Sequence, residues 1–508
     1  MNSANRVIFN TLVLYLKMAV TMVVSLYSVR LVLAALGESD YGIFNVIGGV
    51  VAMLSFFQTA LSVSTQRYLS FYHGKGDKNL LIQVFNNSVA LHIAMGIIVV
   101  GLLEIIGRIF IDYYLQIPND RIDVAKTIFH FSCASVFFSI IGVPYTAVIN
   151  ANERLIFIAV ISILESFEKL GLAIFLSYTG YDKLFVFGFF MAVIMFVSFV
   201  FYFITCKRKF DECRHFDIHS MNKSLLKDLM GFASWNVVGS LTTMSKNQGM
   251  SILFNIFKGP TVNAAYAVAH QVSAQLQFFS ATMLRAMNPQ IMKSEGCGNH
   301  PRMLRLSLTA SKFGFLLLAF FAIPCIFEMD FILGIWLKNV PKHTAYFCDL
   351  ILVAMLFDQL TVGVNSAFQA CKLVKHSTIF VGATKLLILP VGYILLKMEM
   401  SVYTVVLGYA VVELLAGWVR VVLAKKMMKL SILSYVGNVY LKIFVPVLLS
   451  VLGCFLASEC EIEPYRIILT MSLSTLLFLP SVYFCSMDEN EKQIVRNMMS
   501  KIKRGKCA

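Results

Sequence analysis

Long apolar runs separated by short polar turns dominate the chain. Each run holds about 20 residues or more, which is the length an α-helix needs to cross the hydrocarbon core of a bilayer. The pattern therefore predicts an all-α integral membrane protein with about fourteen transmembrane helices. We expect these spans near 10–36, 41–67, 84–107, 124–149, 155–178, 184–206, 226–257, 261–291, 305–328, 346–370, 378–397, 402–424, 441–457 and 465–485.

One stretch of this pattern occurs twice. Residues 41–77 align without a gap to residues 263–299, and the pair Phe56-Phe57 falls on Phe278-Phe279. Two glycines near the end of each copy also coincide. A weaker echo joins the helix exit at 147–153 to the exit at 366–372. Many transporters are built from such internal repeats, so the pattern predicts two related lobes.

The repeat divides the chain into parts. We expect an N-terminal lobe of six helices over 1–210 and a C-terminal lobe of six helices over 211–430. The two spans within 431–487 have no counterpart in the first half and are interpreted as an appendage. A basic tail over 488–508 follows them.

Composition and charge agree with a membrane location. The chain is 58% hydrophobic and 14% charged, whereas soluble proteins are about 25% charged. With the N-terminus in the cytoplasm, basic runs such as 207–209 and 425–426 gather on the cytoplasmic side, as the positive-inside rule requires. Both termini are therefore expected in the cytoplasm. We interpret the net charge of +15 as a means of binding anionic lipid headgroups. No nucleic-acid partner is expected.

Several classes of chemistry are disfavoured. The longest loop, 207–227, is about twenty residues, which leaves no room for a catalytic domain outside the bilayer. The 11 cysteines include no CxxC pair, the spacing typical of metal and redox sites. The sequence thus predicts no enzyme activity, no cofactor and no metal site.

Polar residues inside the spans are costly unless they face protein or water, so they indicate function. The span 226–257 carries five of them at spacings of four, three, four and four, which is one helical face. Interhelical hydrogen bonding would explain any single member, but a continuous face suits a water-filled cavity. The face consists of Asn236, Ser240, Thr243, Asn247 and Ser251.

Four cations lie in spans whose apolar parts hold no acid. They are Lys17, Arg30, Lys246 and Arg285. An unpaired buried cation is costly, so we expect these side chains to face a cavity that receives an anion. The cavity would also be lined by Gln58, Asn247, Gln271 and Gln275. Arg67, at a predicted span end, is instead expected to extend to the headgroups.

Three acids within spans are candidates for ion coupling. Asp358, Glu165 and Glu413 could each relay protons or cations, or each could be half of a structural pair. Lys385 is a candidate partner for Asp358. Lys169, one helical turn from Glu165, is a candidate partner for that carboxylate.

One region of the chain resembles a known family. The run Leu36-Gly37-Glu38-Ser39-Asp40-Tyr41-Gly42-Ile43-Phe44, followed by Arg67-Tyr68 and Gly76-Asp77-Lys78, resembles the start of the polysaccharide biosynthesis flippases. These belong to the multidrug/oligosaccharidyl-lipid/polysaccharide (MOP) exporter superfamily, which also contains lipid II flippases and multidrug and toxin extrusion (MATE) antiporters.

The resemblance implies a fold and an activity. The fold would be two six-helix lobes in a V, around a basic cavity. The activity would be translocation of undecaprenyl-diphosphate-linked oligosaccharide across the bacterial inner membrane for O-antigen or capsule synthesis, with polysaccharide polymerase and chain-length regulator proteins as partners. Coupling would be to an H⁺ or Na⁺ gradient or to the membrane potential. The chain departs from the family at Gln58-Thr59-Ala60, where an Asp-Leu-Gly is frequent.

Two other hypotheses compete with the flippase. A drug or cation antiporter of the same fold predicts acids in the spans 226–257 and 261–291, and none occurs between 229 and 292. A membrane glycosyltransferase or polymerase predicts a sizeable outer loop with carboxylates, and the outer loops are short. The sequence therefore favours the flippase.

Overall fold

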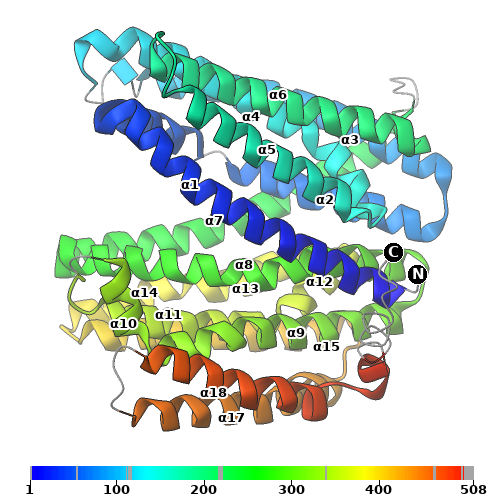
Figure 1. The fold of residues 1–508 in the computed structure, drawn as a ribbon. Helices are drawn as coiled ribbons and strands as arrows, with labels where there is room; N and C mark the ends of the chain where they lie inside the picture. The colour runs from blue at the N-terminus through cyan, green and yellow to red at the C-terminus, as the bar shows by residue number, and fades with distance from the viewer. Residues whose placement is uncertain are drawn as a thin grey trace. The chain divides into compact units, whose positions relative to one another are not determined.

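The computed structural model describes residues 3–52, 55–109, 111–112, 117–214, 221–337, 340–460, 465–493 and 496. These residues are almost entirely helical, and none of them forms a strand (Figure 1). The predicted all-α class is confirmed. Most of the predicted basic tail lies outside the described residues.

Short connections join consecutive helices, and the helices differ in length. The longer ones are α1 (Ser3–Ala52), α2 (Ser55–Lys75), α3 (Lys78–Ile109), α4 (Ile122–Ala151), α5 (Leu155–Phe175), α6 (Lys183–Lys209), α7 (Lys223–Lys258), α8 (Pro260–Gly296), α9 (His300–Phe327), α11 (Thr344–Gln359), α13 (Val374–Leu386), α15 (Val402–Met428), α17 (Leu441–Ser458) and α18 (Arg466–Ser481). The shorter ones are α10 (Met329–Trp336), α12 (Val362–Ala370), α14 (Ile388–Lys397) and α16 (Ile432–Tyr435).

Within the described residues, 10 helical segments are long and apolar enough to cross a membrane. The predicted spans 155–178, 226–257 and 261–291 are helical over most of their length but fall outside this set because they carry more polar or charged residues. In α5, for example, Glu165, Glu168 and Lys169 interrupt the apolar run. The predicted span 41–67 includes residues 53–54, which lie outside the described residues. The count of about fourteen is therefore not confirmed.

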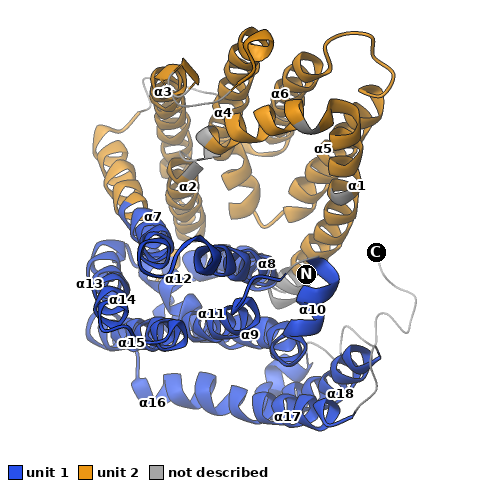
Figure 2. Cartoon of the chain, turned by 90° about the vertical axis from the view of Figure 1, so that its left-hand side faces the viewer, with its two compact units in different colours: residues 1–6, 238–295, 299–508 blue, residues 7–237, 296–298 orange. Residues whose placement is uncertain are grey.

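The chain forms two compact units (Figure 2). The N-unit comprises residues 7–237 and 296–298, and the C-unit comprises 1–6, 238–295 and 299–508. The division falls inside α7 rather than in the loop before it. The domain limits drawn from the sequence stay a prediction.

The turn predicted between the spans 10–36 and 41–67 takes a different form. Residues 38–40 are helical, and α1 breaks only at Gly37, which has φ 78° and ψ 170°. That backbone conformation is accessible essentially to glycine alone. The break is stabilised by Arg121, which lies 2.9 Å from the buried Asp40 carboxylate and also pairs with Asp182. Burial alone would raise the pKa of Asp182, but the Phe185 N–H and Arg121 lower it.

The backbone supports the internal repeat. Gly76 and Gly298, which coincide in the aligned copies, have φ of 75° and 73°, and the helix after each begins two residues later, at Lys78 and His300. At the second aligned exit, Glu153 and Lys372 have φ of 58° and 60°. Left-handed backbone is uncommon for residues other than glycine, so this agreement at matched positions favours a true duplication.

Each unit has its own apolar core. In the N-unit, Phe129 and Ile128 of α4 lie against Gly107 and Gly188, where a β-carbon would come within 2.0 Å and 2.7 Å of their side chains. Glycine thus permits close helix packing at both places. In the C-unit, the buried rings of Phe254, Tyr266 and Phe347 pack together.

The predicted appendage, α17 and α18, is attached to the C-unit by buried ion pairs. Glu328, at the end of α9, is 1% exposed and lies 3.2 Å from Arg466 at the start of α18. Thr470 donates a hydrogen bond of 2.7 Å to the same carboxylate. Lys312 of α9 contacts Glu491, which follows α18, at 2.7 Å. These pairs fix both ends of α18 to α9.

Candidate functional site

One membrane-spanning segment of the C-unit is broken near its middle. The segment Thr344–Ala370 is divided into α11 and α12, because Thr361 leaves the helical backbone conformation with φ −118° and ψ 8°. In transporters, broken helices of this kind present polar backbone groups to the interior of the membrane. The structure therefore places polar backbone where the sequence pattern predicted one continuous span.

The break between α11 and α12 is satisfied by side chains from other helices. Tyr435 donates its hydroxyl proton to the carbonyl oxygen of Leu360 at 3.0 Å, and Ser311 accepts a hydrogen bond of 3.0 Å from the N–H of Gly363. Gly363 is required here, because a β-carbon would lie 2.0 Å from a backbone oxygen of α9. The break is thus a packed, hydrogen-bonded feature.

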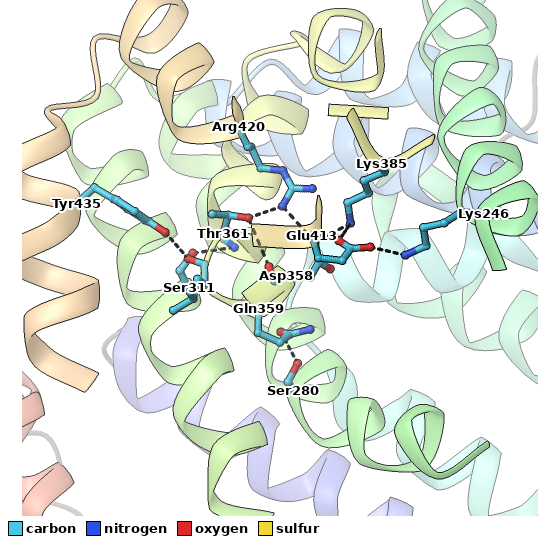
Figure 3. A network of polar contacts seen from close by, with 12 residues as sticks. Lys246, Ser280, Ser311, Asp358, Gln359, Thr361, Lys385, Glu413, Arg420 and Tyr435 are labelled. Carbon is cyan, nitrogen blue, oxygen red and sulfur yellow. Dashed lines mark hydrogen bonds and ion pairs between the residues drawn. The ribbon is translucent and has the colours of Figure 1, made fainter. Parts of the chain in front are cut away.

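Five charged side chains from four helices meet beside this break (Figure 3). In order of contact they are Lys246 of α7, Glu413 of α15, Lys385 of α13, Asp358 of α11 and Arg420 of α15, and we call them the charge chain. Lys246 pairs with one oxygen of Glu413, and Lys385 lies 3.0 Å from the other. Lys385 also lies 2.8 Å from Asp358, whose same oxygen is 3.5 Å from Arg420. Positive and negative groups therefore alternate, with a cation at each end.

The charge chain is deeply buried and carries one excess positive charge. The side chains of Lys246, Glu413 and Arg420 are 7%, 3% and 8% exposed, while that of Asp358 is 29% exposed. Arg420 also donates to the hydroxyl of Thr361 at the helix break. Buried charges are tolerated only when paired. Here two carboxylates pair with three cations, which leaves one positive charge unbalanced.

The structure gives Lys246 an acidic partner on another helix. Its own helix holds no acid in the apolar part, but Glu413, 167 positions away, is its partner. The ammonium group also lies 4.7 Å from the centre of the Tyr409 ring. Ion pairing with Glu413, the structural alternative, therefore accounts for a buried lysine at this place. Its role in substrate binding stays a prediction.

The other C-unit candidates lie apart from these ion pairs. Asn247 follows Lys246 on α7 and is half-buried, with a buried side-chain oxygen that accepts no hydrogen bond from the part of the chain that the structure describes. Gln271, Gln275 and Arg285 are exposed on α8. The structure thus joins Lys246 directly to Glu413 and, through Glu413 and Lys385, to Asp358, and among the described residues it shows no contact from Gln271, Gln275 or Arg285 to the charge chain.

Sequence spacing places Thr361 on the helical face of Asp358 and Arg420 on that of Glu413, but neither was selected as a site residue, and Tyr409 was missed. Arg420 and Thr361 form one end of the charge chain, and Tyr409 covers the other. A signal was present, because Glu413, Arg420 and Tyr409 are separated by seven and four residues and so share one face of α15.

The N-unit holds a separate cavity with a mainly apolar lining. Its volume is about 270 Å³, and its polar lining residues are Gln58, Lys169 and three serines, Ser132, Ser135 and Ser139. Gln58 donates a hydrogen bond of 2.6 Å to Ser139. Lys169 lies 2.6 Å from Glu165, so the predicted structural pair is present.

The remaining N-unit cations differ in environment. Lys17 is half-buried and engaged with a neighbouring group, and Arg30 is exposed. Arg67 does not extend to the headgroups as predicted. Its side chain is 4% exposed, and its guanidinium lies 4.6 Å from the ring centres of Tyr68 and Phe71. Aromatic faces attract such a cation, which explains why it stays inside.

No family model matches the sequence, and no curated protein matches it. Solved structures do match. A MATE transporter in the bent conformation has a TM-score of 0.71 at 14% identity, over 84% of this chain and 96% of that one. A MOP superfamily transporter from Pyrococcus furiosus, described as having a binding pocket of reverse polarity, gives 0.70 at 14% over 84% and 95%. The MATE transporter ClbM in complex with Rb⁺ gives 0.65 at 14% over 84% and 95%. The chain is thus a multi-pass helical membrane protein with the fold of the MATE transporters of the MOP superfamily.

Proposed function

We propose that this protein is a transporter of undecaprenyl-diphosphate-linked oligosaccharide, which it moves from the cytoplasmic to the outer leaflet of a bacterial inner membrane by alternating access. The observation that carries this proposal is the excess positive charge of the buried charge chain. A diphosphate is an anion, and the end cation Lys246 is held by a single carboxylate. Polymerase and chain-length regulator proteins would then use the exported glycan.

Exchange of partners at Lys246 supplies a mechanism for substrate capture. A phosphate oxygen that replaces Glu413 at Lys246 would leave Glu413 bound to Lys385, 3.0 Å from its other oxygen. A charge-assisted hydrogen bond contributes about 1.5–3 kcal/mol. The displaced carboxylate keeps a partner, so the exchange avoids an unpaired buried charge.

The same exchange offers a route to coupling. Protonation of Glu413 would free Lys246 for the substrate, and loss of that proton would restore the ion pair and release the substrate. Asp358, which is more exposed than Glu413, would be the point of proton entry. Na⁺ bound at Glu413 in place of the proton would free Lys246 in the same way, and the membrane potential is a third source of energy for transport.

A drug or cation antiporter is the second candidate, and the fold comparisons favour it more directly than the flippase. A neighbour of similar fold was solved with Rb⁺, and Asp358 and Glu413 are carboxylates within the C-unit. For them to hold a cation, the lysines that now occupy them would have to be displaced.

Surface-glycan export separates the two candidates. In a flippase-deficient strain that expresses the protein, Lys246→Met should lower export about tenfold or more at matched protein levels. Lys425→Met, an exposed lysine on α15, is the control and should export normally. Normal export by Lys246→Met would refute the proposal that Lys246 binds the diphosphate of the substrate.

Proteoliposomes test the antiporter. Proton-driven uptake of a fluorescent organic cation that is abolished by Asp358→Asn, together with normal glycan export by Lys246→Met, would establish the second candidate.

A further inference from the structure

Three potential metal ligands from distant segments meet at one end of the C-unit. Glu295 lies in the last turn of α8, His300 begins α9, and Cys371 follows α12. Their ligand atoms all lie within 4.8 Å of one another. The carboxylate oxygen of Glu295 is 2.9 Å from Nδ1 of His300. No short motif contains all three residues, so cysteine spacing could not predict the cluster.

The hydrogen bond on the far side of the His300 ring fixes its tautomer. Nε2 lies 3.0 Å from the backbone oxygen of Met428 at the end of α15. A carbonyl oxygen only accepts, so Nε2 carries the proton. Histidines that bind metals commonly donate their second N–H in this way. Nδ1 then faces the Glu295 carboxyl group at 2.9 Å, and the two atoms are held together either by a proton shared between them or by a metal ion that both bind.

Cys371 supplies the third donor. Its thiol sulfur lies within 4.8 Å of both a carboxylate oxygen of Glu295 and a ring nitrogen of His300. Thiolate sulfur and imidazole nitrogen are donors that zinc accepts together with a carboxylate.

The equivalent junction of the N-unit is closed differently. In the aligned repeats, His73 corresponds to Glu295 and Asn152 to Cys371. Asn152 accepts a hydrogen bond from His73 at 3.1 Å, with Nε2 as the donor, and donates to Glu212 at 3.0 Å. The N-unit thus joins these helix ends by hydrogen bonds, whereas the C-unit brings together three residues of types that are common metal ligands.

We propose that Glu295, His300 and Cys371 form a Zn²⁺ site that joins the ends of α8, α9 and α12. Zinc accepts thiolate, imidazole and carboxylate together, whereas Mg²⁺ and Ca²⁺ prefer oxygen alone. Three protein ligands leave a fourth position for water, so the ion would exchange. The site is independent of the transported substrate, and its occupancy would set how firmly these helix ends are held together.

Zinc binding to the purified full-length protein tests the proposal. After treatment with a chelator, the protein in detergent is titrated with Zn²⁺ against a chromophoric chelator, and retained metal is measured by elemental analysis. We expect one Zn²⁺ per chain. Glu295→Gln, His300→Ala and Cys371→Ser should each weaken binding by more than the about 10–100-fold that a second-shell change costs. Cys485→Ser, which removes an exposed thiol elsewhere in the C-unit, should bind as the wild type does.

A measurement on the wild type guards against variants that misfold. Zinc should slow maleimide labelling of Cys371, followed by peptide mass spectrometry, and should leave labelling of the exposed Cys297 unchanged. Absence of retained zinc, equal zinc binding by Cys371→Ser, or unchanged labelling of Cys371 would each overturn the site and leave an ordinary His300–Glu295 ion pair. None of these results depends on the cargo.

Discussion

Glu413 is shared by two lysines, and this sharing sets the electrostatics of the C-unit. Lys246 and Lys385 each contact one of its oxygens. Removal of the acid would leave two buried cations close together. Removal of Lys246 would leave two cations and two carboxylates, which is a balanced set. Substitutions of different members of the charge chain should therefore change the stability of the protein by very different amounts.

Glu413→Gln should lower the free energy of unfolding by about 3–5 kcal/mol, because it breaks a buried pair from one side. Lys246→Met introduced into the same variant should recover a substantial part of that loss. Thermal unfolding in detergent measures both effects, with Glu459→Gln at an exposed carboxylate as a control that should change stability by less than about 0.5 kcal/mol. Equal stability of Glu413→Gln and the wild type would contradict the assigned charge chain.

Lys246→Met alone should remain well folded while it loses glycan export. A cation used only for structure would show the reverse, with stability and export lost in proportion. The comparison needs the unfolding midpoint and the export level on the same variant, so it separates a binding role from a pairing role.

At the scale of elements, two helix breaks rest on glycines with different physical demands. Gly37 needs its backbone conformation, and nothing lies within 4 Å of its missing β-carbon. Gly363 has ordinary backbone but no space. Only the break beside Gly363 divides a run that was predicted from the sequence as one span, 346–370, because Gly37 lies at the predicted junction of the spans 10–36 and 41–67.

Gly363→Ala should destabilise the protein by about 1–3 kcal/mol, as overpacking in a core does. Gly334→Ala, in α10, meets open space and should be neutral or slightly stabilising, because alanine is the better helix former. Unfolding midpoints of the two variants make the test. Equal midpoints would show that α12 does not pack against α9 as described.

Gly37→Ala should cost about 1–3 kcal/mol through backbone strain, or should straighten α1. Gly42→Ala, on the same helix and equally free of neighbours, is the matched control. A spin-label distance between residues 30 and 46 distinguishes strain from straightening. No change in either distance or stability would exclude a break at Gly37.

At the scale of the whole molecule, two units with the same helix exits hold different interiors. The N-unit holds a mainly apolar cavity of about 270 Å³ with serines and Gln58 among its lining residues. The C-unit encloses the charge chain. The repeated helix exits thus frame two interiors of different chemistry.

The orientation of this frame in the membrane is testable. Tyr181 and Arg208 lie at opposite ends of α6, whose 27 residues span about 40 Å at 1.5 Å per residue. In a cysteine-free background, Tyr181→Cys should react with an impermeant maleimide from outside, whereas Arg208→Cys and Lys426→Cys should react only after permeabilisation. External labelling of Arg208→Cys would reverse the predicted orientation.

The sequence by itself determined the properties that depend on neighbours along the chain. Apolar runs of membrane length gave the helical class, the spacing of Asn236 to Ser251 gave the polar face of α7, and an ungapped alignment gave the repeat. These signals are local because helical periodicity and bilayer thickness act on consecutive residues.

Only the tertiary structure decided which charges meet. Lys246 and Glu413 are 167 positions apart, and Glu295 and Cys371 lie on different helices, so no local spacing relates them. The same holds for the break at Leu360, whose carbonyl is satisfied by Tyr435, 75 positions away. A buried charge or an open backbone group is stable only beside a partner, and that partner is chosen by helix packing in three dimensions.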